Sequence, residues 1–235
     1  MPITTVLFDL DGTLLPMDQD VFVKEYFGRI AGKLAPQGYE PQKLVDTIWR
    51  GTGAMVKNDG TVCNEEAFWK VAVAVYGDRI VKDKRFFDEF YETEFDKIKA
   101  VCGCHPAAAE IVHRLKEKGL RVALATNPIF PARATQWRIQ WAGLAPEDFE
   151  LYTTYENSRY CKPNPDYYRD ILTQLNISAD ECLMVGNDVG EDMIAQQLGM
   201  KVFLLTDCLI NRTGADISRY PHGSFAELAA FLERI

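Results

Sequence analysis

The chain has 235 residues, of which 47% are hydrophobic and 26% are charged, and its formal net charge is -8. This acidic balance argues against a protein built to bind nucleic acid or an anionic membrane surface, and no apolar run approaches the ~20 residues that span a bilayer. The N-terminal segment also lacks the basic and long apolar regions of a signal peptide, so we expect a cytoplasmic protein.

The first predicted element is a buried strand over residues 4–8, TTVLF, which runs directly into Asp9. Leu10 and a second carboxylate, Asp11, follow, and then Gly12. Side chains two residues apart in a strand point to the same face, so Asp9 and Asp11 start on one side of the chain. Two like charges this close require a partner that neutralises them.

Residues 17–99 carry helical patterns and no comparable strand. Apolar side chains recur there at helical spacing, and Asn64 is placed to cap the third helix. We interpret the aromatic residues of these stripes as packing core rather than a ligand site. The pattern predicts a helical cap over 17–99, inserted into an α/β core that comprises residues 1–16 and 100–235.

Six cysteines are too few over this length for a disulfide scaffold. Cys102, Cys104 and His105 could supply three of the four ligands of a zinc site, with Cys161 as the fourth. The alternative is a loop with incidental thiols, in which His105 caps the helix that follows. The sequence leaves both interpretations open.

The remainder of the chain alternates strand and helix. Apolar runs predict strands at 120–125, 150–154, 181–185 and 201–205. Helical patterns occupy 106–118, 131–142, 165–175 and 191–198, and Ser224 with Glu227 forms a capping box that begins a last helix. Continuous apolar strands alternating with helices predict a parallel sheet covered on both faces.

Polar clusters lie at the ends of two predicted strands and just before one predicted helix. Thr126 and Asn127 end the second strand, Lys162 precedes the helix at 165–175, and Asn187 and Asp188 end the fourth strand, with Asp192 just beyond. Each has an ordinary alternative: a turn carboxylate, a surface lysine, a helix cap or a first-turn acid. Together they predict one site, because ligands of open parallel sheets bind beyond the carboxyl ends of the strands.

Four of these segments stand in the order of a known set of motifs. DLDGTL at 9–14, TN at 126–127, KP at 162–163 and GNDVGED at 186–192 resemble the motifs of the haloacid dehalogenase-like hydrolase superfamily. The chain is similar to its phosphatase-type members with a helical cap between the first and second motifs. The resemblance implies a Rossmann-like α/β fold whose five parallel strands have the spatial order 5-4-1-2-3.

The resemblance also implies a role for each motif residue. Asp9 is the expected nucleophile and Asp11 the general acid and base. The expected cofactor is Mg²⁺, with a carboxylate oxygen of Asp9, the backbone carbonyl of Asp11 and a carboxylate oxygen of Asp188 as its ligands. Thr126, Asn127 and Lys162 are expected to bind the phosphoryl group, and Gly12, Asn187 and Asp192 to support the site.

The function implied is a Mg²⁺-dependent phosphatase that acts on a small soluble phosphorylated metabolite, through an aspartyl-phosphate. Asp11 favours phosphoryl transfer over dehalogenation, because an oxygen leaving group needs a proton and a halide does not. A phosphomutase, a phosphonatase and a catalytically silent binding protein stay open as alternatives. The segments 49–53 and 58–60 are the expected specificity loops, while the substrate and the oligomeric state are undetermined.

Overall fold

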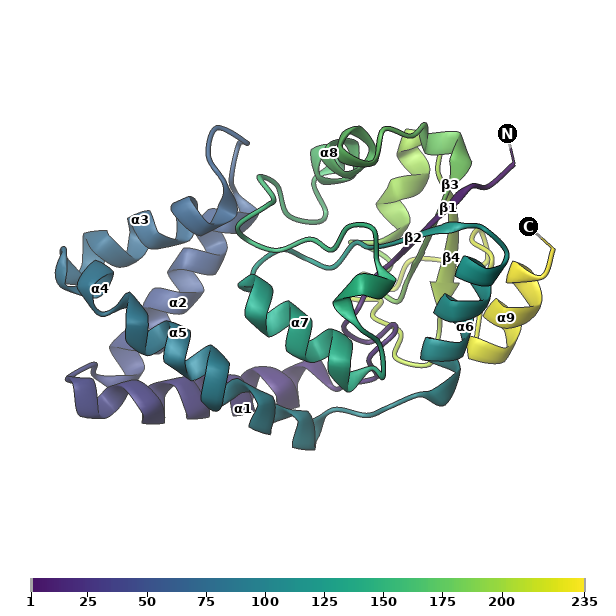
Figure 1. Ribbon diagram of the computed structural model, residues 1–235. Coiled ribbons are helices and arrows are strands. Elements are labelled where there is room, and N and C mark those ends of the chain that lie inside the picture. Colours follow the sequence, from purple (N-terminus) through teal and green to yellow (C-terminus); the bar gives the residue numbers. More distant parts are fainter. Residues whose placement is uncertain (1, 235) are drawn as a thin grey trace.

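Five parallel strands form a single sheet in the computed structural model, which describes residues 2–234 (Figure 1). In chain order they are β1 (Thr5–Phe8), β2 (Arg121–Leu124), β3 (Cys182–Gly186), β4 (Lys201–Leu205) and β5 (His222–Gly223). Their spatial order is β2-β1-β3-β4-β5, so β1 lies between β2 and β3. The predicted α/β parallel fold is confirmed, and the strands at 4–8, 120–125, 181–185 and 201–205 neighbour one another as expected.

The prediction of a regular strand at 150–154 is wrong. These residues run beside β2 and form one isolated parallel bridge, between Leu124 and Tyr152. The N–H groups of Leu124 and Thr153 each donate across this edge, to Leu151 and Leu124 respectively. The fifth strand is instead the short β5 at the opposite edge, which pairs with β4.

Both faces of the sheet are buried, and alternate residues of each strand serve opposite faces. Val6 and Phe8 of β1 pack in one core cluster, while Leu7 packs in the other. The first cluster includes side chains of α6 (Pro106–Glu117), α7 (Ala132–Trp141) and α9 (Phe225–Leu232), and the second includes those of α8 (Pro165–Leu175). This two-sided cover explains why the strands are continuously apolar.

The core helices begin and end close to the predicted residues, with one exception. The segment at 191–198 forms a 3₁₀ helix, Met193–Leu198, preceded by a turn. At this turn the Asp192 carboxylate lies over Gly186, where an added Cβ would lie 2.2 Å from Asp192 Cγ. The predicted capping box is confirmed, since the Ser224 N–H donates to Glu227 Oε2 at 2.8 Å.

Five α-helices of the described residues lie between β1 and α6 in the chain, and we refer to them as the cap helices. They are α1 (Gln19–Leu34), α2 (Pro41–Val56), α3 (Asn64–Tyr76), α4 (Arg79–Lys82) and α5 (Lys84–Thr93). In Figure 1 they lie to one side of the sheet, beyond the ends of the strands. Asn64 is the first residue of α3 rather than its cap, and its side chain donates to the Pro128 carbonyl of the core at 3.2 Å.

Two chain segments connect the cap helices to the sheet, and they lie side by side. Met17 and Cys102 form an antiparallel bridge, and the Gly103 N–H donates to the Pro16 carbonyl at 2.7 Å. The short 3₁₀ helix Phe95–Val101 leads into the second of these connections.

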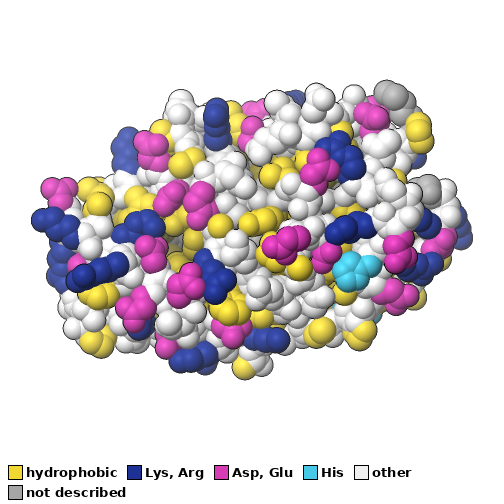
Figure 2. All heavy atoms as spheres, viewed as in Figure 1, with side chains coloured by type: hydrophobic (Ala, Val, Ile, Leu, Met, Phe, Trp, Pro, Cys, Tyr) yellow, Lys and Arg dark blue, Asp and Glu magenta, His cyan; other side chains and the backbone are white. Residues whose placement is uncertain are grey.

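The exposed surface carries charges of both signs. Figure 2 shows acidic and basic side chains interspersed on one face, with hydrophobic side chains between them. No helix within residues 2–234 has the length and apolar character needed to cross a membrane.

Candidate active site

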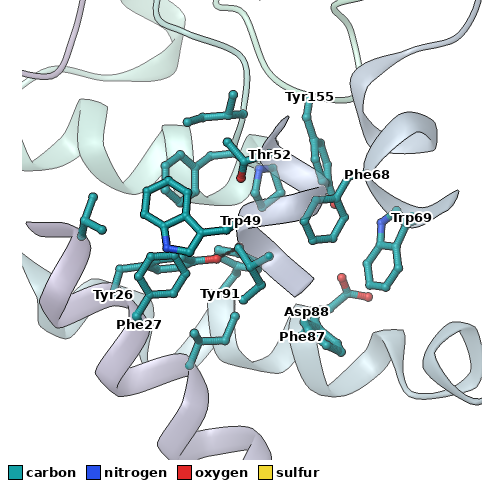
Figure 3. A pocket seen from close by; sticks show the side chains of 16 residues that line it. Tyr26, Phe27, Trp49, Thr52, Phe68, Trp69, Phe87, Asp88, Tyr91 and Tyr155 are labelled. Atoms are coloured by element: carbon teal, nitrogen blue, oxygen red, sulfur yellow. Dashed lines mark hydrogen bonds between the residues drawn. The ribbon is translucent and has the colours of Figure 1, made fainter. Parts of the chain in front are cut away.

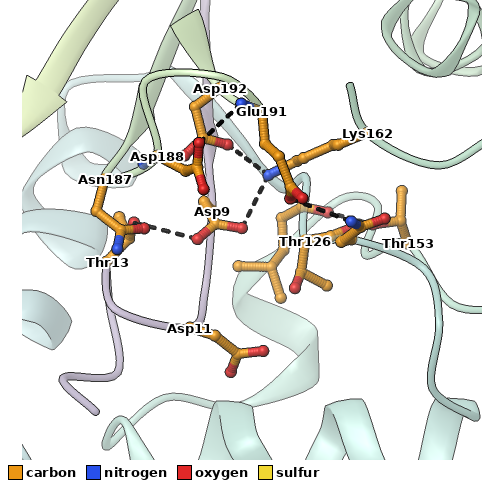
Figure 4. Close-up of polar contacts among 12 residues, drawn as sticks. Asp9, Asp11, Thr13, Thr126, Thr153, Lys162, Asn187, Asp188, Glu191 and Asp192 are labelled. Atoms are coloured by element: carbon orange, nitrogen blue, oxygen red, sulfur yellow. Dashed lines mark hydrogen bonds and ion pairs between the residues drawn. The ribbon is translucent and has the colours of Figure 1, made fainter. Parts of the chain in front are cut away.

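Asp9 lies directly after β1, at the carboxyl end of the sheet. Its N–H donates to the Val185 carbonyl at 2.9 Å, which continues the pairing with β3. Its Oδ1 lies 2.8 Å from Lys162 Nζ, and its Oδ2 accepts a hydrogen bond from Thr13 Oγ1 at 3.2 Å (Figure 4). With 7% of its surface exposed, Asp9 is held in one orientation at the floor of the site.

Lys162 is a buried cation between two carboxylates. Only 1% of its surface is exposed, and Nζ lies 2.6 Å from Asp192 Oδ1 as well as beside Asp9. Burial alone would lower the pKa of Lys162, but the charges of Asp192 and Asp9 outweigh it and raise this pKa well above the usual value. Lys162 is therefore charged at neutral pH, and the surface-lysine interpretation is wrong.

Asp192 fixes the loop that carries Asp188. Burial raises the pKa of Asp192, and Lys162 opposes this shift. Asp192 Oδ2 accepts the N–H of Asp188 at 2.9 Å, and Asp188 Oδ1 in turn accepts the N–H groups of Gly190 and Glu191 at 2.7 and 3.0 Å. Asp192 thus points inward from the position before the 3₁₀ helix, and the alternative of a first-turn acid that answers the helix dipole is wrong.

The implied Mg²⁺ can be tested against the oxygen atoms at this place. Within residues 2–234, no three His, Cys, Asp or Glu side chains are grouped so that they could hold a metal ion alone. The expected ligand set includes only two carboxylates, from Asp9 and Asp188, and takes the backbone carbonyl of Asp11 as its third member. Asp188 uses Oδ1 for backbone N–H groups, which leaves Oδ2 for a further partner. Asp9 and Asp188 line one cleft at adjacent strand ends, and an all-oxygen set fits Mg²⁺.

Thr126 and Asn127 follow β2 and line the same cleft. The Thr126 carbonyl accepts hydrogen bonds from Tyr167 Oη at 2.8 Å and Thr153 Oγ1 at 2.6 Å, which anchors this loop to the core. Asn127 Nδ2 donates to Glu191 Oε2 at 3.1 Å, while its buried Oδ1 has no partner within the described residues. Burial raises the pKa of Glu191, whose place in the site was not predicted.

Gly12 makes room for Asn187. Its φ is +82°, and an added Cβ would lie 2.3 Å from Asn187 Nδ2. Asn187 Oδ1 accepts from Thr13 Oγ1 at 3.1 Å. The N–H of Gly12 itself donates to the Leu15 carbonyl at 2.8 Å, which closes the turn after Asp11.

Arg138 is a partner of Asp11 that the sequence did not reveal. It lies on α7 with 1% of its surface exposed, and Nη1 forms an ion pair with Asp11 Oδ2. Its other nitrogens donate to the Ala134 carbonyl at 3.3 Å and Thr135 Oγ1 at 3.2 Å. A signal was present: Arg138 occupies the stripe of α7 that also buries Ala134 and Ile139, where an unpaired charge would be costly.

Asp11 itself points away from Asp9 in Figure 4. Burial raises the pKa of its carboxyl, and the Arg138 charge opposes this effect. Its Oδ1 is buried and has no hydrogen-bond partner within residues 2–234.

A cleft of about 450 Å³ joins these groups to the cap helices. Trp49, Thr52 and Val56 of α2 line it opposite the strand ends. Residues 49–53 are therefore helical rather than a loop, although two of them face the cleft as expected. The segment 58–60 is not part of its lining, since Gly60 packs against the Tyr160 ring.

His105, next to Cys104, has a structural role. His105 Nδ1 accepts the N–H of Ala107 at 3.2 Å, which caps α6, and its ring stacks on Phe225. Cys161 lies elsewhere, where its Sγ accepts from Asn64 Nδ2 at 3.3 Å. The cap interpretation of His105 is confirmed, and no group of residues 2–234 supports the zinc alternative.

A family model and a curated relative each match most of the chain. The model of the haloacid dehalogenase-like hydrolase family matches residues 3–199. The pyrophosphatase PpaX of Bacillus cereus (strain G9842) is 24% identical over 202 residues, which cover 86% of this chain and 82% of that protein.

Two solved structures share the fold over nearly the whole chain. The 2-haloacid dehalogenase from Pseudomonas syringae pv. Tomato DC3000 superposes with a TM-score of 0.67 at 20% identity, covering 99% of each chain. A predicted phosphoglycolate phosphatase from Haemophilus somnus 129PT gives 0.60 at 18% identity, covering 98% of each chain. At these identities the likeness shows the fold alone.

Proposed function

The chain belongs to the haloacid dehalogenase-like hydrolases, and we propose that within this family it is a Mg²⁺-dependent phosphatase of a small, soluble phosphomonoester. The observation that carries the proposal is Asp9, a carboxylate held by Lys162 and Thr13 at the floor of a cleft. A second acid, Asp11, lies two residues further on and lines the same cleft. The relative named as a pyrophosphatase supports hydrolysis of a phosphorus–oxygen bond.

In the first step, an oxygen of Asp9 attacks the phosphorus atom, and the bond from phosphorus to the leaving oxygen breaks. This forms an aspartyl-phosphate and divides one difficult displacement into two easier ones. The protonated Asp11 carboxyl gives its proton to the leaving oxygen, which departs as an alcohol. The raised pKa of Asp11 favours the protonated form that the step requires.

In the second step, water attacks the phosphorus of the aspartyl-phosphate. The Asp11 carboxylate takes a proton from this water, and the bond between phosphorus and Asp9 breaks. The sum of both steps converts ester and water into alcohol and phosphate, and it restores both carboxyl groups. Because Asp11 faces Arg138, its side chain must turn toward the cleft to serve in either step.

The remaining site residues bind or orient. Thr126 and Asn127 would bind phosphoryl oxygens, and Lys162 would orient Asp9 and add positive charge. Gly12, Asn187 and Asp192 would support this arrangement. Mg²⁺ bound by Asp9, Asp188 and the Asp11 carbonyl would offset the negative charge of the carboxylates and the phosphoryl group.

We also propose that residues 17–99 act as a cap on a core of 1–16 and 100–235. The cleft is lined by residues of both parts, such as Trp49 and Asp9. A substrate bound there would be enclosed, which would exclude bulk water during transfer and favours small substrates over macromolecules.

The lining of the cleft disfavours one alternative. A phosphonatase of this kind uses a cap lysine, and no lysine is among the described residues that line the cleft. A phosphomutase shares the core chemistry, and product analysis separates it, since a mutase transfers phosphate to a second position instead of releasing it.

Release of phosphate from 4-nitrophenyl phosphate tests the proposal. We expect release that requires Mg²⁺ and is abolished by EDTA, and a loss of at least about a thousandfold in Asp9→Asn because the nucleophile is removed. Asp46→Asn, an exposed acid of α2, is the matched control and should retain wild-type activity. Undiminished release by Asp9→Asn would show that Asp9 is not the nucleophile.

A further inference from the structure

An apolar pocket lies beside the cleft, and the chemistry proposed at Asp9 gives its lining side chains no role. Its volume is about 90 Å³, and we refer to it as the side pocket. The side pocket and the cleft share five lining residues, which are Val23, Trp49, Thr52, Ile129 and Phe130. The two cavities are therefore adjacent, and only these shared side chains need to lie between a molecule in the cleft and the side pocket.

Aromatic rings form most of the wall of the side pocket. Figure 3 shows Phe27 and Trp49 on one side of it and Phe68 and Trp69 on the other. The Tyr26 and Tyr91 hydroxyls bond to each other at 2.9 Å, so these residues present mainly ring surface. Some of the aromatic residues that the sequence indicated as cap core, such as Tyr91, thus also border a cavity.

Trp49 marks the boundary between the side pocket and the cleft. Its side chain is 52% exposed, although large aromatic residues are otherwise buried in cores or interfaces. It packs against Phe27 with 5.2 Å between ring centroids, and it lines both cavities. An exposed tryptophan fixed at the junction of two cavities is suited to cover an apolar part of a ligand.

The side pocket and the cleft differ in the charged residues that line them. Among the described residues that line the side pocket, Asp88 alone is charged, and none is basic. Those that line the cleft include five acids and one cation, Arg212. Lys162 does not add a free charge, since Asp9 and Asp192 already hold it. A second phosphate or a sugar acid would find no counter-ion in the side pocket, so its occupant is neutral and apolar.

We propose that the substrate is a phosphomonoester whose leaving alcohol carries an apolar group that fills the side pocket. This inference rests on the proposed phosphatase function, and it distinguishes the chain from a pyrophosphatase. The side pocket, at about 90 Å³, is smaller than the apolar cavity of about 150 Å³ that holds benzene. The apolar group is therefore at most a short branched chain or one ring that also extends into the open cleft. Hydrolysis would release that alcohol and inorganic phosphate.

A substrate series with matched leaving groups tests the inference. Benzyl phosphate and ethyl phosphate both release primary alcohols and differ mainly in the ring, while pyrophosphate has no apolar part. With Mg²⁺ present, we expect kcat/KM for benzyl phosphate to exceed that for ethyl phosphate roughly tenfold or more, from burial of the ring. Equal values for the two esters would overturn the inference and leave the phosphatase proposal intact, whereas a preference for pyrophosphate over both esters would overturn the inference and the phosphomonoester assignment together.

A variant at Trp49 tests whether the ring of benzyl phosphate lies in the side pocket. Trp49→Ala should lower the ratio of the benzyl to the ethyl kcat/KM by roughly threefold or more, because Trp49 lines the entrance to the pocket. Val81→Ala is the matched control, since Val81 is 55% exposed on α4 and lines neither cavity. An unchanged ratio in Trp49→Ala would place the ring elsewhere and contradict the inference.

Binding separates this inference from the proposed reaction. Calorimetry with benzylphosphonate and methylphosphonate, which are not hydrolysed, measures the contribution of the ring without turnover. We expect benzylphosphonate to bind roughly tenfold more tightly, and less so in Trp49→Ala. If no ester were hydrolysed, this preference would retain the side pocket as a ligand site while the phosphatase proposal failed. Equal binding of the two phosphonates would exclude the side pocket as a ligand site.

Discussion

Lys162 and Arg138 are cations that the fold buries against carboxylates of the first motif. Lys162 lies between Asp9 and Asp192, and Arg138 pairs with Asp11. Removing one partner of a buried pair is strongly destabilising, because it leaves the other charge uncompensated in a poorly solvated place. These side chains therefore hold the acidic site together in addition to any part in the chemistry.

Arg138→Met should destabilise the protein by about 3 kcal/mol, measured by urea unfolding. The reason is that the buried Asp11 carboxyl loses the cation that opposes its raised pKa, so it must either stay charged without a partner or take up a proton. Arg138→Met with Asp11→Asn should therefore recover part of the loss. Arg169→Met is the control, because Arg169 forms an exposed pair with Asp166 on α8 and should change stability by less than about 1 kcal/mol. A double variant no more stable than Arg138→Met would mean that packing, and not charge, explains the effect.

At the scale of elements, the close contact of α2 with α3 shapes the side pocket. Gly51 of α2 faces Phe68 of α3, and an added Cβ would lie 2.4 Å from Phe68 Cδ2. Glycine lowers the intrinsic stability of a helix, but here it permits a close approach that a methyl group would prevent. Gly53, two positions further along the same helix, has nothing within 4 Å of such a Cβ.

This contrast predicts opposite effects of the same substitution in one helix. Gly53→Ala should stabilise the protein by about 0.5–1 kcal/mol through helix propensity. Gly51→Ala should be less stable than Gly53→Ala by roughly 1–3 kcal/mol, because Phe68 must move. Unfolding midpoints in urea measure both variants, and equal stability of the two would show that Phe68 adapts without cost.

At the scale of the whole molecule, the cleft lies between the cap helices and the sheet, so a ligand bound in it would contact both. Its lining comes from α1 and α2 on one side and from the ends of β1, β2 and β3 on the other. The two connections between these parts touch at Pro16 and Gly103, which is where we expect any relative movement to be hinged. Ligand bound in the cleft should therefore stabilise both parts together.

Thermal unfolding tests this coupling. Mg²⁺ with orthophosphate at about 100 times its Kd should raise the Tm by roughly 5–10 °C, as expected for a ligand that binds only the folded state. Orthophosphate with EDTA should raise the Tm less. Asp188→Asn should lose most of the Mg²⁺-dependent part, and a full Tm response in this variant would exclude Asp188 as a metal ligand.

Several features were determined by the sequence alone. The order of strands and helices, the parallel sheet and the motif residues at the strand ends follow from local patterns: apolar runs, helical spacing and turn residues. Asp9, Thr126 and Asp188 come together because parallel strands place their carboxyl ends at one edge of the sheet. The motif order was sufficient to indicate the family.

Other features were decided only by the tertiary structure, because they depend on which surfaces meet. Arg138 pairs with Asp11, 127 residues away, and no local pattern states which buried stripe will face a given carboxylate. The segment at 150–154 has the composition of a strand, yet only one bridge forms at its edge of the sheet. The side pocket arises where aromatic residues of separate cap helices fail to fill the space between them and the loops of the core, and such a gap is a property of packing rather than of sequence pattern.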